Sequence, residues 1–402
     1  MKRRDAGRPA ILHYCQHSVG LGHLVRSLSV AGALARDFRV VLMSGGKVPA
    51  GIDAPDGVEL VPLPAIGSGD GVGARLVSLV PGMDLEKAWE RRREMLLRQL
   101  EQLRPVAVVI ELFPLGRRMF AAELIPLLEA ARALASPPVI VCSVRDILVA
   151  NGPEQQRRDD QAARRLNRYF DMVVVHADPH FVRLEDTFRP SIPVTPPVQY
   201  SGFVVPPGER SPGRQRQPPE ILVSAGGGRV GGRLLRTAAQ AQLRHLGKLG
   251  ITTRVVTGPF LPAEDAAALS TLAADCPGLS VESFVPDLRT VMAGSSVSVS
   301  QCGYNTALDV LRSGVPALVV PHDDGRETEQ AERARRLAAL GAVRVLPTRD
   351  LSAARLADEI VPLLGTKPKA TTFDQRGAER TAAIVSGLIA EPRLSASIEA
   401  AS

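Results

Sequence analysis

Short apolar runs alternate with longer amphipathic segments along most of the chain. The run at residues 10–15 precedes a segment (24–35) whose apolar residues recur at helical spacing, and further runs follow at 39–43, 106–110, 139–142 and 172–175. Continuous apolar runs are typical of strands buried on both faces of a parallel sheet, because helices cover both faces. The alternation therefore predicts an α/β fold with doubly wound parallel sheets.

A proline-rich region interrupts this alternation near the middle of the chain. Nine prolines lie within residues 189–219, and apolar runs restart at 221–224 and continue to 342–346. We therefore expect two Rossmann-like domains, an N-terminal one over residues 1–205 and a C-terminal one over residues 220–370. Residues 206–219 are the expected linker, and residues 371–402 the expected C-terminal helix and frayed tail.

The charge and composition of the chain exclude several classes of protein. The formal net charge is +7, but arginines and acids are interleaved along the whole chain and aromatic residues make up only 4%. Surfaces on which bases would stack are therefore not indicated, and we expect no nucleic-acid partner. The four cysteines do not have the spacing of a metal site and fit a reducing cytoplasm. Because no apolar run approaches ~18 residues, we expect a cytoplasmic protein, or one peripherally bound at the inner membrane face.

Two glycines lie between the first predicted strand and the first predicted helix. Gly20 and Gly22 allow the backbone to approach a ligand closely, and the free N–H groups at the start of the helix attract anions. His23 begins this helix, where the positive end of the helix dipole favours the neutral imidazole that can take a proton from a hydroxyl. His23 is therefore our candidate general base, with Glu111 and Asp146 as alternatives near the ends of later strands. A plain tight turn with a capping histidine is the non-catalytic interpretation.

A second glycine loop, Gly226-Gly227-Gly228, follows the predicted strand at 221–224. Gly226, Gly228 and Gly231 have the spacing of the dinucleotide-binding fingerprint. That fingerprint also needs an acidic residue at the end of the next strand, and none occurs between Gly231 and Gly258. We therefore interpret the loop as a phosphate-binding loop for a nucleotide other than NAD.

Two polar loops follow later strands of the second half. The first opens a predicted helix, in which Asp309 lies one turn after Asn305 on the same face and can accept hydrogen bonds from a ribose diol. The second ends in Glu329 and Gln330 at the start of another helix, from which they can reach sugar hydroxyls. Solvated polar loops are the alternative interpretation. The candidate ligand-binding residues of the first loop are Gly303, Asn305, Thr306 and Asp309.

In this order along the chain, the motifs resemble those of the family 28 glycosyltransferases, which have the GT-B fold. The family includes the enzyme that transfers N-acetylglucosamine from UDP to a lipid-linked peptidoglycan precursor. Phe113-Pro114-Leu115-Gly116 and Gly314-Val315-Pro316 add to the resemblance, which covers nearly the whole chain and is closest to a bacterial group of predicted glycosyltransferases. The resemblance implies two domains facing a central cleft, with the nucleotide sugar on the C-terminal domain and the acceptor on the N-terminal domain.

The resemblance also implies roles for individual residues. His23 matches a histidine suspected to act near the acceptor or the diphosphate, Gly226 to Gly228 match the loop that meets the donor diphosphate, and Val285 matches the position whose backbone contacts uracil. Asp309 stands where the family has a glutamate that holds the ribose, and its side chain is one methylene shorter. Glu329 and Gln330 stand where a pair of glutamines reads the donor sugar, so Glu329 adds a negative charge there and leaves the donor open.

The implied activity is transfer of a hexose-type sugar, such as N-acetylglucosamine, from a nucleoside-diphosphate donor, with UDP favoured, to an unidentified acceptor hydroxyl, with inversion at C1. The chain has no Asp-x-Asp triplet for a metal, and helix N-termini can stabilise the leaving diphosphate. We therefore expect a metal-independent reaction without a cofactor. A sugar-nucleotide 2-epimerase of the same fold and a non-catalytic nucleotide-sugar-binding protein remain alternatives. The glycine-rich segment 67–82 is the expected acceptor loop, and the arginines at 91–93 face either an anionic acceptor or solvent.

Overall fold

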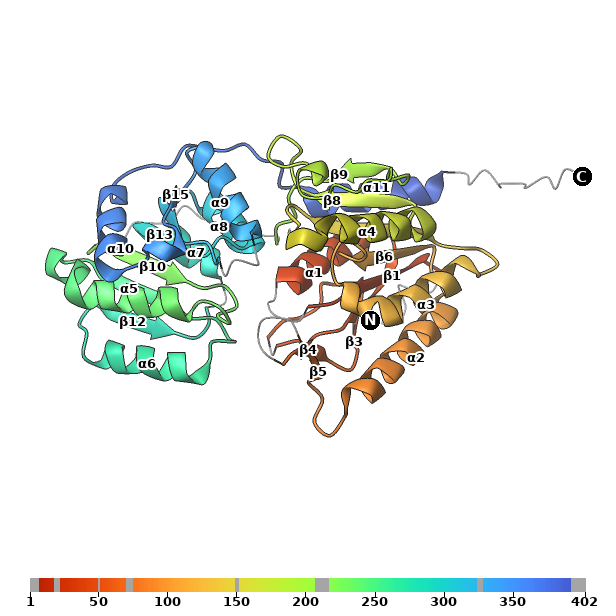
Figure 1. The fold of residues 1–402 in the computed structure, drawn as a ribbon, viewed down its shortest axis with the longest axis horizontal. Helices are drawn as coiled ribbons and strands as arrows, with labels where there is room; N and C mark the ends of the chain where they lie inside the picture. The colour runs from red at the N-terminus through yellow and green to blue at the C-terminus, as the bar shows by residue number, and fades with distance from the viewer. Residues whose placement is uncertain are drawn as a thin grey trace, which may run out of the picture.

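The computed structural model describes residues 7–17, 22–49, 51–69, 75–148, 152–206, 217–285, 287–323 and 328–391. They form two lobes that lie side by side, each built on its own sheet (Figure 1). The first sheet has the strand order β3-β2-β1-β6-β7-β8-β9, and the second has the order β12-β11-β10-β13-β14-β15. Every pairing within these two sheets is parallel. The predicted doubly wound α/β fold is confirmed.

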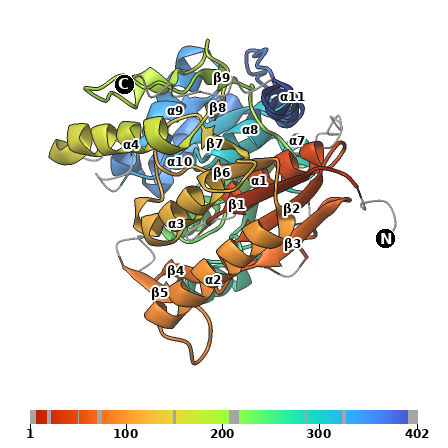
Figure 2. The ribbon, with the colours of Figure 1, turned by 90° about the vertical axis from the view of Figure 1, so that its right-hand side faces the viewer.

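Helices cover both faces of the first sheet. Helices α2, α3 and α4 pack on the face that carries Leu12 and Ile110, and α1 and α11 pack on the face that carries Ile11 and Val109 (Figure 2). The strands are β1 (Ala10–Cys15), β2 (Arg39–Ser44), β3 (Val58–Pro62), β6 (Ala107–Glu111), β7 (Val139–Arg145), β8 (Met172–His176) and β9 (Val198–Tyr200), and a separate hairpin contains β4 (Ile66–Ser68) and β5 (Leu76–Ser78). The helices are α1 (Gly22–Leu34), α2 (Leu85–Leu103), α3 (Ala121–Arg132), α4 (Gln155–Tyr169) and α11 (Gly377–Ala390).

The sequence pattern did not predict β3, the β4–β5 hairpin or β9. β3 is an edge strand whose residues are partly or fully exposed, so it has no continuous apolar run. β9 lies inside the proline-rich region and pairs with β8 as the other edge of the sheet. Proline is tolerated at such an edge, because an edge strand need not donate to a neighbour on its outer side. The proline-rich composition of this region therefore did not indicate the strand β9.

The second sheet is enclosed in the same way. Helices α5, α6 and α10 cover one face and α7, α8 and α9 the other, with α8 and α9 on the side of this lobe that faces the first lobe (Figure 1). The strands are β10 (Glu220–Ser224), β11 (Thr252–Val256), β12 (Leu279–Glu282), β13 (Val297–Ser300), β14 (Ala317–Val319) and β15 (Arg344–Val345). The helices are α5 (Gly232–Arg244), α6 (Ala263–Ala274), α7 (Leu288–Ala293), α8 (Tyr304–Ser313), α9 (Glu329–Ala339) and α10 (Ala353–Ile360).

The chain crosses between the lobes twice, and the two crossing segments lie together. The Phe203 N–H donates to the Asp374 carbonyl at 2.7 Å, and the Gly377 N–H donates to the Phe203 carbonyl at 3.0 Å. The rings of Phe203 and Phe373 pack edge to face with centroids 5.5 Å apart. The second crossing returns the chain to the first lobe, where α11 packs beside α1 (Figure 2). The expected linker between 207 and 216 and the expected tail from 392 lie outside the described residues.

Helix α2 carries the arginine run at 91–93, and its members have different surroundings. Arg91 and Arg93 are exposed. Arg92 is fully buried and donates to both carboxylate oxygens of Glu123, at 2.7 and 2.6 Å. The expectation that the run faces solvent or an anionic acceptor is therefore wrong for Arg92, because a helix turns neighbouring residues to different sides.

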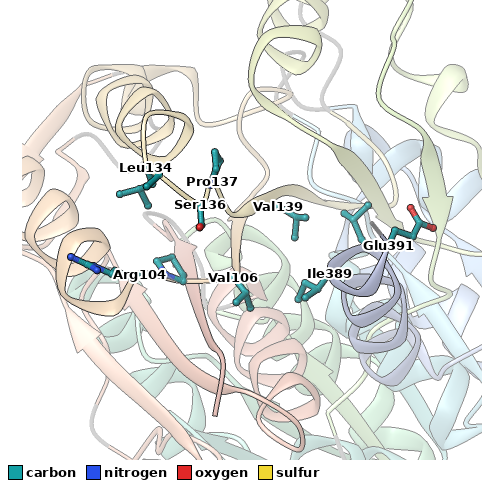
Figure 3. Close-up of a pocket in the computed structure, with 11 residues that line it drawn as sticks. Arg104, Val106, Leu134, Ser136, Pro137, Val139, Ile389 and Glu391 are labelled. Carbon is teal, nitrogen blue, oxygen red and sulfur yellow. The ribbon is translucent and has the colours of Figure 1, made fainter. Parts of the chain in front are cut away.

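The strand order places ligand-binding loops between the lobes. In each sheet the order reverses, at β1/β6 in the first and at β10/β13 in the second, and loops that diverge at such a point leave a crevice beyond the carboxyl ends of the strands. A cavity of about 540 Å³ lies elsewhere, between the starts of β6 and β7 and the end of α11 (Figure 3). Its lining includes Val106, Val139 and Ile389. This cavity lies at the amino ends of the strands, whereas the crevice lies beyond their carboxyl ends.

Candidate active site

The candidate base His23 is paired with a buried carboxylate. His23 lies in the first turn of α1, and its Nδ1 is 2.7 Å from the Oε1 of Glu111, the last residue of β6. At neutral pH an ionised carboxylate can only accept a hydrogen bond, so the Nδ1 of His23 carries the proton and its Nε2 keeps its lone pair. Burial, which the charge of Glu111 only partly opposes, lowers the pKa of His23 to about 3. The imidazole is therefore neutral at neutral pH, with Nε2 able to accept a proton.

Two arginines keep Glu111 ionised. Arg26, three residues after His23 on α1, donates to the Glu111 Oε1, and its guanidinium lies 5.3 Å from the centre of the Tyr304 ring in the second lobe. Burial alone would raise the pKa of the Glu111 carboxyl, but its interaction with His23 and the charges of Arg26 and Arg117 hold it below its usual range. The residue that follows Glu111, the buried Leu112, has a φ of 66°. Left-handed backbone at a leucine is strained, and such strain is common in loops that form functional sites.

Asp146, an alternative base, is fully occupied by an arginine of the other lobe. Its two carboxylate oxygens accept from the Nε and Nη2 of Arg333 in α9, both at 2.7 Å. The Nη1 of Arg333 also donates to the Cys302 carbonyl at 2.7 Å. Burial alone would raise the pKa of Asp146, but Arg333 holds it below its usual range. Because both oxygens of this carboxylate already accept from Arg333, Asp146 is less accessible than His23 to an acceptor hydroxyl.

The first two residues of α9 face in different directions. The carboxylate of Glu329 pairs with Arg145 at the end of β7 in the first lobe, with Nη1 3.1 Å from Oε1. The Oε1 of Gln330 accepts the backbone N–H groups of Cys302 and His322, both at 3.1 Å. Glu329 therefore reaches across the cleft, whereas Gln330 joins the loops after β13 and β14.

The N-terminus of α8 lies where both glycine loops approach. A methyl group placed on Gly22 would be 3.4 Å from the Asn305 Nδ2, and one placed on Gly226 would be 3.7 Å from the Thr306 Oγ1. A methyl group on Gly303, the N-cap of α8, would meet open space. The free N–H groups at this end of α8 carry the positive end of its dipole. This end of α8 lies beside Gly22 of the first lobe, and such a helix end attracts anionic groups.

The loop after β10 needs glycine for its own packing. Gly228 has a φ of 90°, and a methyl group on it would be 2.3 Å from the Thr257 carbonyl oxygen. The Gly227 carbonyl accepts the Phe260 N–H at 3.0 Å. The glycines therefore allow two backbone segments to touch, in addition to any role toward a phosphate. Gly20, of the first glycine loop, lies outside the described residues.

The residues predicted to hold the nucleoside lie in α8 and just after β12. Asp309, in the second turn of α8, is partly buried, and its carboxylate has no hydrogen bond to another described residue. Burial, only partly opposed by Arg312, raises its pKa to about 6. A perturbed and unpaired carboxylate of this kind is typical of a binding site. Val285, just after β12, is buried, and the residue after it lies outside the described part of the chain.

The structure thus brings together residues from both lobes that the sequence singled out separately. His23, Glu111 and Asp146 from the first lobe face the α8 and α9 N-termini of the second. The sequence patterns missed the basic side chains of this region, Arg26, Arg117, Arg145 and Arg333. Helical spacing offered a signal for two of them, because Arg26 follows His23 by three residues and Arg333 follows Glu329 by four.

The described residues contain neither a cluster of metal ligands nor a helix fit to span a membrane. Within those ranges, no group of three or more histidine, cysteine or acidic side chains is arranged to hold a metal ion. No helix in the described part of the chain combines the length and the apolar character needed to cross a bilayer.

Comparison with known proteins agrees with this architecture. The family model described as "Glycosyltransferase family 28 C-terminal domain" matches residues 223–385. A UDP-N-acetylglucosamine–N-acetylmuramyl-(pentapeptide) pyrophosphoryl-undecaprenol N-acetylglucosamine transferase of Paenarthrobacter aurescens is 32% identical over 152 residues, which are 38% of this chain and 39% of that enzyme. The match to this relative therefore spans about two fifths of its length.

Two further similarities extend over both lobes. The transferase of the same name from Methylobacterium nodulans is 26% identical over 381 residues, which are 90% of this chain and 93% of that enzyme. The crystal structure of the calicheamicin glycosyltransferase CalG4 superposes with a TM-score of 0.56 at 21% identity, covering 95% of this chain and 94% of that one. Residues 223–385 are thus similar to the C-terminal domain of the family 28 glycosyltransferases, and the chain as a whole has the two-lobed fold of these glycosyltransferase structures.

Proposed function

We propose that this protein is a glycosyltransferase that moves a hexose-type sugar from a nucleoside-diphosphate donor to an acceptor hydroxyl. UDP is the favoured nucleotide and N-acetylglucosamine a candidate sugar, as in the names of the curated relatives. The observation that carries the proposal is the neutral His23, held by Glu111, on the opposite side of the cleft from the free N-terminus of α8. A base and an anion site that face each other are what displacement of a diphosphate requires.

The donor is assigned to the second lobe. The diphosphate would accept hydrogen bonds from the N–H groups at the start of α8 and lie against the loop at Gly226. The ribose would donate to Asp309, whose raised pKa supports this role, as does the absence of a hydrogen bond from its carboxylate to any other described residue. The backbone of Val285 would contact the nucleobase of the donor, as the resemblance implies.

The reaction balances as a single displacement. The acceptor hydroxyl gives its proton to the Nε2 of His23, and its oxygen forms a bond to C1 of the sugar. The bond between C1 and the diphosphate oxygen breaks, and the diphosphate leaves with the electron pair. Glu111 stabilises the imidazolium that forms, and the α8 dipole stabilises the leaving charge without a metal. Attack opposite to the leaving group inverts the configuration at C1.

The acceptor is assigned to the first lobe, beside the β4–β5 hairpin that falls within the expected acceptor segment. In the names of the curated relatives the acceptor is attached to undecaprenol, a lipid. A lipid-linked acceptor would hold the first lobe at a membrane surface, in agreement with a peripheral location.

Three measurements test the proposal. First, thermal shift with a panel of nucleotides should single out one, because a bound ligand stabilises the folded chain by mass action. Second, His23→Ala should keep donor affinity and lose at least about a hundredfold in release of UDP from a UDP-sugar with an acceptor panel. His180→Ala is the matched control, because that side chain is 94% exposed. Equal turnover of the two variants would exclude His23 as the base.

Third, donor incubated alone separates the alternatives. A 2-epimerase would convert the donor sugar without an acceptor, and a binding protein would hold the donor and transfer to nothing. Either result would replace the transferase proposal.

A further inference from the structure

One ion pair joins the lobes inside the candidate site. The Arg145 side chain is 14% exposed and the Glu329 side chain 8%, and both terminal nitrogens of Arg145 contact carboxylate oxygens of Glu329. Arg145 ends β7 of the first lobe, and Glu329 begins α9 of the second. The pair is therefore largely shielded from water and spans the cleft.

The position of the pair relative to the reacting groups follows from its neighbours. On one side, Gln330 holds the backbone N–H of Cys302, the residue before the N-cap of α8, so Glu329 lies close to the proposed diphosphate position. On the other side, Arg145 ends β7, whose Ser143, two residues earlier, is the register partner of Glu111, and Glu111 is the partner of His23. The pair thus lies between the diphosphate end and the base. If the proposed function holds, the donor sugar lies there too, because its C1 is bonded to the diphosphate and is attacked by the hydroxyl at His23.

The charges around this position determine what a sugar there can carry. Arg145 and Glu329 sum to zero, and the neighbouring pair of Asp146 and Arg333 also sums to zero. The positive charge of Arg26 and Arg117 in excess of Glu111 is opposed by the donor's own diphosphate. An uncharged sugar leaves these two ion pairs balanced, whereas a uronic acid adds a carboxylate for which neither pair has a spare cation, in a place that is shielded from water. Burying such a charge without a partner is costly.

We propose that Arg145 is a specificity-determining residue for the donor. By compensating Glu329, it leaves the Glu329 carboxylate able to accept hydrogen bonds from sugar hydroxyls and restricts the donor to nucleoside-diphosphate sugars whose sugar is uncharged. The inference rests on the proposed function and adds to it the class of donor sugar. The competing interpretation is that the pair only braces the two lobes.

The test is calorimetric binding of UDP, UDP-glucose and UDP-glucuronic acid to the full chain and its variants. The wild type should bind UDP-glucose at least about tenfold more tightly than UDP-glucuronic acid. Glu329→Gln frees Arg145 to pair with the uronate, so the ratio of the two affinities should shift toward UDP-glucuronic acid by at least about tenfold. The double variant R145Q/E329Q removes both charges together and should keep the wild-type ratio. The matched control is Asp186→Asn, which removes another ion pair between the lobes, that of Asp186 with Arg336, and should also keep the ratio.

The outcomes distinguish a failure of the proposed role of Arg145 from a failure of the proposed function. If no variant changes the ratio while UDP still binds, the pair is a brace and the inference is wrong. A shift in the double variant equal to that in Glu329→Gln would also overturn it, because the effect would then not depend on charge compensation. Absence of UDP binding to the wild type would refute the proposed function and the inference with it. A ratio between two sugars on the same nucleotide is insensitive to general destabilisation, so partial unfolding of a variant does not imitate the expected result.

Discussion

Replacement of Arg92 by methionine removes the charge that compensates Glu123 in the core of the first lobe. Both side chains are fully buried, and Arg92 also donates to the Gly45 carbonyl at 2.8 Å and to the Gln16 Oε1 at 2.7 Å. Methionine has a similar length and fills most of the same space. The main cost is therefore a buried carboxylate that has lost its cation and keeps the hydrogen bond from the Tyr14 hydroxyl, and loss of one partner from a buried pair costs about 3–5 kcal/mol. We expect R92M to lower the free energy of unfolding of this lobe by about that amount.

Urea unfolding followed by tryptophan fluorescence measures this effect directly. Trp89 is the single tryptophan of the chain, and its ring lies 5.6 Å from the Arg92 guanidinium. The matched control is R91M, because Arg91 pairs with Glu94 at 3.1 Å while both side chains are 58% exposed. Such a surface pair contributes about 0.5 kcal/mol at most. Adding Glu123→Gln to R92M should recover at least about 1 kcal/mol by removing the lone charge.

A loss below about 1 kcal/mol in R92M would contradict this reasoning. So would equal losses in R92M and R91M, because burial is the only large difference between these neighbouring arginines.

Three further expectations concern the ion pair of Asp146 with Arg333, the buried histidines and the nucleotide site. Asp146→Asn and Arg333→Met should each lower the free energy of unfolding by about 3 kcal/mol, and a double-mutant cycle should give a coupling energy above about 1 kcal/mol. Additive losses of stability would mean that the pair does not contribute to holding the lobes together. Burial lowers the pKa values of His13 and His17 to about 4 and those of His23 and His176 to about 3. The unfolded chain binds these protons below pH 6.5, so stability is full above that pH and falls toward pH 4, by up to about 2 kcal/mol per histidine at pH 5; urea midpoints that do not change between pH 7.5 and 5 would argue against this. Because the pKa of Asp309 is about 6, nucleotide affinity measured by calorimetry should fall as the pH drops through 6, and D309N should weaken binding and remove that dependence.

The strands and helices of this chain were largely predictable, and the reason is local. The apolar runs at β1, β6, β7 and β8 mark strands because a strand buried on both faces must be apolar throughout. The glycine loop after β10 was also visible, because a close backbone contact at Gly228 excludes a side chain and the positive φ of Gly226 favours glycine. The edge strands β3 and β9 were missed, since an edge strand is only partly buried and lacks the apolar run.

The pairings that make the site were not predictable in the same way. The hydrogen bond of His23 with Glu111 joins residues 88 positions apart, and it depends on β6 lying next to β1 in the sheet. The ion pairs of Arg145 with Glu329 and of Asp146 with Arg333 join residues 184 and 187 positions apart, in different lobes. The local sequence around each of these side chains gives no sign of its partner. Buried and exposed arginines are preceded by residues of the same types.

By itself, the amino-acid sequence determined the secondary structure, the parallel sheets, the glycine loops and the candidate base, because burial and backbone sterics act over a few neighbouring residues. Only the tertiary structure decided which carboxylate accompanies His23, which carboxylate is already neutralised, and which arginines line the cleft. These pairings form because strand order and the contact of the two lobes bring charged groups within a few ångströms of one another. At such distances burial strengthens the electrostatic interaction, so each pairing fixes the protonation state of its carboxylate.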